Sequence, residues 1–135
     1  MLDMLALAIV LLIAAYFVGL GVLALLRPKT VEVFLRRFAG SPLEHFSELA
    51  IRVIVGSAFV VWSPYMLTPM VFEAFGWVLI ATSGALLVLP WKLHSRFAQW
   101  SVPLATRNMK LFGVGSLSGG VFLVCSLLLG AGYQR

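Results

Sequence analysis

Residues 41–62 read SPLEHFSELAIRVIVGSAFVVW, a polar helix start that continues without a break into an apolar run. Ser41 and Glu44 have the spacing of a capping box, with a proline at the first helical position, so the sequence marks where this helix begins. Glu48 and Arg52 follow Glu44 at intervals of four residues and lie on the same helix face. We therefore predict a polar stripe that descends along one helix to the edge of a bilayer.

The composition around this helix excludes a soluble globular domain. Apolar residues make up 61% of the 135 residues and charged residues 11%, and the mean hydropathy is +1.03. A chain of this length has room for about four spans of roughly 20 residues each. We predict one all-α integral membrane domain over residues 1–135, with spans at about 4–26, 49–66, 71–89 and 111–133.

Two shorter stretches are predicted to be amphipathic helices that lie in the membrane interface, at about 30–38 and 91–100. Arg36 and Arg37 fall on the polar side of the first stretch, where they would meet lipid phosphates. In the second, Trp91 and Trp100 lie on the apolar side and Arg96 on the polar side. We expect Val102 and Pro103 to end this second helix.

The cations predict the orientation. Nine of the ten Lys and Arg residues flank the two longer connections, and Arg135 is the exception. By the positive-inside rule both connections are cytoplasmic, so both termini and the turn at residues 63–69 face the periplasm. We expect a multi-pass protein of the bacterial inner membrane, with anionic phospholipids rather than nucleic acid as the partner of its formal charge of +5.

Small residues mark helix-packing faces. Gly115 and Gly119 lie four residues apart in the last span, as do Ser116 and Gly120, which is the spacing that lets another backbone approach closely. Gly56 is the corresponding candidate in the second span. The sequence leaves open whether the partner is another span of this chain or a helix of another subunit.

The two halves of the chain share one pattern: a span, a proline, an amphipathic stretch, a Pro-Leu pair and a second span with a cation and glycines near its start. A tandem duplication would give two halves of the same orientation, related by an axis along the membrane normal. A generic unit of helix, proline, interfacial helix and helix explains the pattern equally well.

Side chains able to carry chemistry are sparse. His45 and His94 both fall in interfacial segments and lack the spacing of a zinc-binding helix, and Cys125 stands alone within an apolar run. No nucleophile, nucleotide-binding or proton-relay pattern occurs. We expect no enzyme activity, no metal and no cofactor.

The dense charged group of Glu44, Glu48 and Arg52 has three interpretations: a structural surface pair, a contact with lipid or partner, or a site of transport or catalysis. An exposed pair at this spacing stabilises a helix by only about 0.3–0.5 kcal/mol. We include Glu48 and Arg52 with Arg36, Arg37, Trp91, Arg96 and Trp100 as candidate lipid or partner contacts.

The overall pattern, with a cation followed by glycine at span starts and Glu73 ahead of a glycine-rich apolar helix, resembles small bacterial membrane proteins of the DoxX type. The resemblance covers no diagnostic motif, and no functional residue is carried over from it. We expect a non-catalytic accessory or scaffold subunit of a larger bacterial membrane complex, or a self-associating protein. The alternative is a membrane protein that binds or transports a small solute, a lipid or a quinone.

Overall fold

The structure is a computed structural model that describes residues 1–38 and 42–133, and every element in these ranges is a helix. Four helices are long and apolar enough to cross a membrane, which indicates a membrane protein: α1 (Leu2–Leu26), α3 (Pro42–Trp62), α4 (Pro69–Val88) and α6 (Met109–Tyr133). Two shorter helices, α2 (Pro28–Phe38) and α5 (Trp91–Arg107), and the single turn η1 (Ser63–Tyr65) connect them. The predicted all-α class with four such helices is confirmed.

Prolines set most of the helix boundaries, as the sequence predicts. Pro28 and Pro69 are the first residues of α2 and α4, where a missing N–H costs no helical hydrogen bond. Pro90 is the cap that precedes α5. The capping interaction predicted at Ser41 lies outside the described residues.

Pro103 is an exception, and the prediction that α5 ends there is wrong. The helix continues through Pro103 to Arg107. Proline removes the hydrogen bond to the carbonyl of Gln99, but both residues are exposed, so solvent or lipid headgroups can satisfy that carbonyl. Only one further turn follows, so the distortion has little helix to disrupt.

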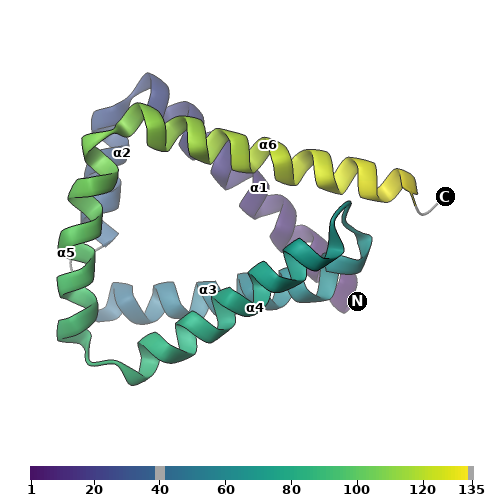
Figure 1. Cartoon of the computed structure of the whole chain (residues 1–135), viewed down its shortest axis with the longest axis horizontal. Coiled ribbons are helices and arrows are strands. Elements are labelled where there is room, and N and C mark those ends of the chain that lie inside the picture. The colour runs from purple at the N-terminus through teal and green to yellow at the C-terminus, as the bar shows by residue number, and fades with distance from the viewer. Residues whose placement is uncertain (39–41, 134–135) are drawn as a thin grey trace.

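The four long helices form two close pairs that diverge like the sides of a wedge (Figure 1). α1 packs along α6, and α3 packs along α4. The pairs converge at the narrow end, where η1 lies and where α1 begins and α6 ends. α2 and α5 lie side by side across the wide end, which they close.

Glycines let the helices of each pair approach closely. A Cβ added at Gly56 of α3 would lie 2.7 Å from the carbonyl oxygen of Gly76 in α4, and one added at Gly76 would lie 2.5 Å from the carbonyl oxygen of Gly56. Between α1 and α6, a Cβ at Gly21 would lie 2.6 Å from the backbone nitrogen of Leu117. In a bilayer such contacts matter more than hydrophobic burial, because lipid tails are as apolar as the helices.

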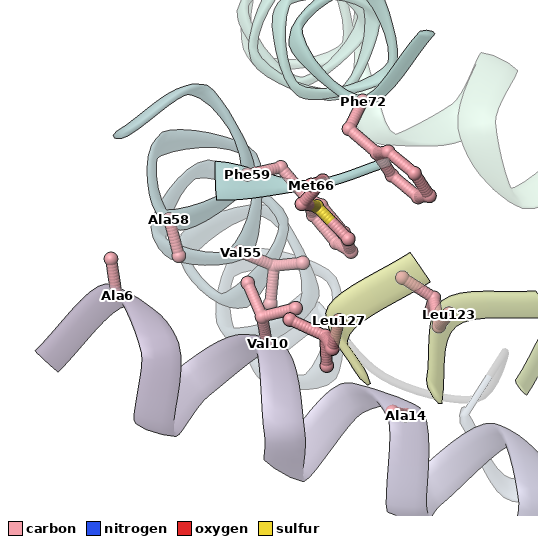
Figure 2. Close-up of a cluster of buried hydrophobic side chains, with 10 residues drawn as sticks. All are labelled: Ala6, Val10, Ala14, Val55, Ala58, Phe59, Met66, Phe72, Leu123 and Leu127. Atoms are coloured by element: carbon pink, nitrogen blue, oxygen red, sulfur yellow. The ribbon is translucent and has the colours of Figure 1, made fainter. Parts of the chain in front are cut away.

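The larger of two buried clusters lies at the narrow end, where both pairs meet (Figure 2). Small residues of α1 face α3 there, and Val10 and Phe59 are almost completely buried. α1 and α3 are in contact at the narrow end, whereas α4 and α6 hardly approach each other in the described part of the chain. The two pairs are therefore joined through α1 and α3, and the wedge is open between α4 and α6.

Candidate functional site

An apolar cavity of about 510 Å³ occupies the open side of the wedge. It is bounded by side chains from all four long helices: Phe17 of α1, Phe59 of α3, Val71, Phe72 and Phe75 of α4, and Phe112, Gly115, Ser116, Gly119, Phe122 and Leu123 of α6. We call it the slot. Phe75 and Phe122 are 43% and 48% exposed, so the slot opens to the surroundings between α4 and α6.

The wall of the slot on α6 follows from helical periodicity. Its six residues recur at intervals of three and four, which places them on one face of the helix. From Phe112 to Leu123 this face is about 16 Å long at 1.5 Å per residue, or roughly half the thickness of a bilayer hydrocarbon core. The slot is therefore a groove along the helix axis, about as long as one leaflet is deep.

Aromatic rings close the narrow end of the slot. Phe72 lies between two rings, at 6.0 Å from Phe59 and 5.6 Å from Phe122, both stacked. Phe59 also contacts Phe75 edge to face at 5.3 Å. Such arrangements contribute about 0.5–1.5 kcal/mol each beyond their buried area. The rings join α3, α4 and α6 at this end. Beyond the rings, toward the wide end, the helices separate.

The one hydroxyl in the lining is already engaged within the protein. Ser116 Oγ donates a hydrogen bond of 2.8 Å to the carbonyl oxygen of Phe17, which joins α6 to α1. The hydroxyl proton is therefore not available to a ligand. The remaining lining side chains are hydrocarbon or glycine, so the slot suits a wholly apolar occupant.

The predicted small-residue positions fall into two groups. Gly56, Ser116 and Gly120 contact a neighbouring helix of this chain; a Cβ at Gly120 would lie 2.8 Å from the backbone nitrogen of Val18. Gly115 and Gly119 contact none, because a Cβ at either position meets nothing within 4 Å. These two glycines instead leave the wall of the slot bare, and packing against a second protein at this place stays a prediction.

The charged stripe on α3 is engaged within the α3–α4 pair. Arg52 donates from Nη2 to Thr82 Oγ1 at 3.0 Å, and its Nη1 lies 3.5 Å from Glu48 Oε1. Thr82 in turn donates to the carbonyl oxygen of Val78 at 2.7 Å. The side chains of Arg52 and Glu48 are 30% and 33% exposed, so the pair lies at the surface of the wide end.

The remaining predicted contacts lie on α2 and α5. Arg36 pairs with Glu32 at 2.9 Å, and Arg37 is exposed. On α5, Arg96 and Trp100 are exposed, whereas Trp91 turns toward the start of α3, where its ring lies 5.4 Å from that of His45. His45 is buried at 4% exposure. The side chain of His94 lies outside what the structure describes.

Within the described residues, no three His, Cys, Asp or Glu side chains come together at a spacing that could hold a metal ion. No known family model matches the chain, and no curated protein or solved structure is significantly similar to it. What the protein does must therefore be argued from its geometry.

Sequence reasoning missed the slot and the acceptor Thr82. The spacing of Phe112, Gly115, Gly119 and Phe122 was visible as one helix face, but a face of this kind equally predicts a packed contact. The gap arises only because α4 and α6 diverge, which is a property of the assembled helices.

Proposed function

We propose that this membrane protein binds a long apolar chain, such as a lipid acyl chain or the isoprenoid tail of a quinone, in the slot between α4 and α6. The observation that carries the proposal is the apolar cavity of about 510 Å³, which opens to the surroundings between α4 and α6. This volume lies within the range of about 300–1,000 Å³ typical of ligand sites. A chain enters sideways from the surrounding lipid, so no aqueous path is needed.

The shape of the slot suits a flexible chain, because its wall follows one face of α6 for about 16 Å and, apart from Ser116, is lined by hydrocarbon side chains and glycine. A flexible hydrocarbon chain can follow the groove from Phe112 to the rings at its narrow end.

Chemistry favours an apolar chain over a polar solute. A transported solute needs hydrogen-bonding or charged groups along its path, because burying a polar group without a partner costs several kcal/mol. Ser116 is the single polar side chain of the lining, and its hydroxyl is donated to Phe17. These features support the binding of a lipid or a quinone, which was part of the alternative expected from the sequence. They give no support to the transport of a small solute.

Filling the slot tests the proposal. Gly119→Leu adds a side chain where a Cβ meets nothing, so the fold should be retained while the chain is displaced. We expect the variant, purified in mild detergent, to retain at least one fewer lipid or quinone molecule by mass spectrometry. A phospholipid with a photoactivatable acyl chain should crosslink to Phe112 or Phe122 in the native protein and far less in the variant.

Gly132→Leu is the matched control, because Gly132 is also free of contacts and lies on the same helix outside the slot. This control should retain the native amount of lipid. Equal retention in all three proteins, or crosslinks spread evenly over α4 and α6, would show that the slot holds no specific chain.

The scaffold function remains a second proposal. Gly115 and Gly119 favour it, because neither contacts a helix of this chain and a helix of another subunit could lie over the opening of the slot. The composition of the particle extracted in mild detergent separates the two proposals. A large assembly that Gly119→Leu disrupts would support the scaffold; a particle of this chain with bound lipid or quinone supports chain binding.

A further inference from the structure

A second recess lies on α5, away from the slot. Its volume is about 420 Å³, and it is lined by Trp91, Lys92, Leu93, Ser95, Arg96 and Gln99. Unlike the slot, it combines two cations, a hydroxyl and an amide with apolar edges. It shares no residue with the slot and does not depend on the function proposed above.

Among the described residues, neither cation of the recess takes part in an ion pair. In the described part of the chain, ion pairs join Arg36 to Glu32 and Arg52 to Glu48, and neither includes Lys92 or Arg96. The sequence contains no Asp or Glu after Glu73, so α5 has no acid of its own. Like charges one turn apart destabilise a helix by about 0.2–0.5 kcal/mol, which a bound anion would reverse.

The other groups of the recess suit a phosphate that carries an apolar body. Ser95 and Gln99 lie one turn apart on the same side as Arg96 and can donate hydrogen bonds to phosphate oxygens. The recess begins at the first residue of α5, so the positive end of the helix dipole adds to the attraction. Trp91 and Leu93 provide apolar contact for the part of a lipid just below its headgroup.

We infer that the recess on α5 binds the phosphodiester headgroup of an anionic phospholipid, with Lys92 and Arg96 as the charged ligands and Ser95 and Gln99 as neutral donors. A membrane lipid is favoured over free phosphate because the recess has apolar edges and because α5 joins two helices that are long and apolar enough to cross a membrane.

Native mass spectrometry of the full-length protein in detergent tests this inference. The protein is titrated with phosphatidylglycerol and, separately, with phosphatidylcholine of identical chains. We expect tighter binding of the first phosphatidylglycerol than of phosphatidylcholine. Lys92→Gln with Arg96→Gln should weaken phosphatidylglycerol binding about 25-fold, on the order of fivefold per cation, and change phosphatidylcholine binding less than about twofold.

Arg107→Gln with Lys110→Gln is the matched control, because it removes the same charge at the same end of the molecule outside the recess. We expect less than about a threefold change. If the double variant of the recess does not fold, judged by its helical circular dichroism, Arg96→Gln alone should still weaken binding about fivefold.

Three results would overturn the inference. The first is equal weakening by both pairs of substitutions, which would mean diffuse charge attraction. The second is absence of a preference for phosphatidylglycerol. The third is binding of inorganic phosphate alone, with displacement of phosphatidylglycerol, which would make free phosphate the ligand. None of these results bears on the proposal that the slot binds an apolar chain, because Gly119→Leu tests that proposal through other residues.

Discussion

Two adjacent glycines of α6 have opposite surroundings. Gly120 lies against the backbone of Val18 in α1, whereas Gly119 faces the slot and meets nothing within 4 Å. The residues are chemically identical, so the difference comes only from the 100° that separates neighbouring positions on a helix. The structure therefore assigns Gly120 to holding the fold and Gly119 to keeping the slot open.

This assignment predicts different effects of one added methyl group. Gly120→Ala should lower the free energy of unfolding by about 1–3 kcal/mol, because its Cβ overlaps backbone that cannot rotate away. Gly119→Ala should change it by less than about 0.5 kcal/mol. Unfolding in detergent, followed by circular dichroism, measures both. Equal destabilisation would contradict the close approach of α1 and α6 at Gly120.

At the scale of helices, the sequence predicted the number of long helices but not which of them pair. Run length and the positions of Pro28, Pro69 and Pro90 suffice for the helices, because an apolar stretch of about 20 residues has few other stable forms. The pairing of α1 with α6 depends on which strip of small residues faces which neighbour. Gly115 and Gly120 are equivalent candidates in the sequence, so only the assembled bundle distinguishes them.

The candidate sites were predictable to different degrees. Glu48 and Arg52 were found from their spacing of four residues, but their partner Thr82 lies 30 residues from Arg52 and has no local signal. Arg96 was found as a surface cation, but the sequence did not show that it shares a recess with Lys92 and Gln99. Local chemistry was therefore visible in the sequence, and the spaces between elements were not.

The whole molecule has an uneven distribution of charge. The helices at the wide end, α2 and α5, carry most of the described cations, whereas the narrow end has few charges (Figure 1). This asymmetry supports the proposal that the wide end faces the cytoplasm, with α2 and α5 in the membrane interface.

Cysteine labelling in bacterial cells tests this orientation. With Cys125→Ser as background, Leu67→Cys places a thiol in the narrow-end turn and Leu104→Cys one on α5; both positions are exposed. A membrane-impermeant maleimide should label position 67 in intact cells and position 104 only after permeabilisation. The reverse pattern would contradict the proposed orientation.

The unequal lengths of the two helix pairs bear on bilayer thickness. α1 and α6 have 25 residues each, about 37 Å, whereas α3 and α4 have 21 and 20, about 30 Å. In a hydrocarbon core of roughly 30 Å, the short pair can stand upright while the long pair tilts by about 35°. We expect the angle of the wedge to reflect the difference between these two tilts.

A thicker bilayer would let the long pair stand more upright, bring α6 toward α4 and narrow the slot. We expect nanodiscs of longer-chain lipids to reduce acyl crosslinking at Phe112 and Phe122, with crosslinking at the outer surface of α6 as the control. Unchanged crosslinking across thicknesses would show that the two pairs are rigidly fixed. Crosslinking that falls as the bilayer thickens would mean that membrane thickness alone, without a ligand or a covalent modification, regulates the access of lipid chains to the slot.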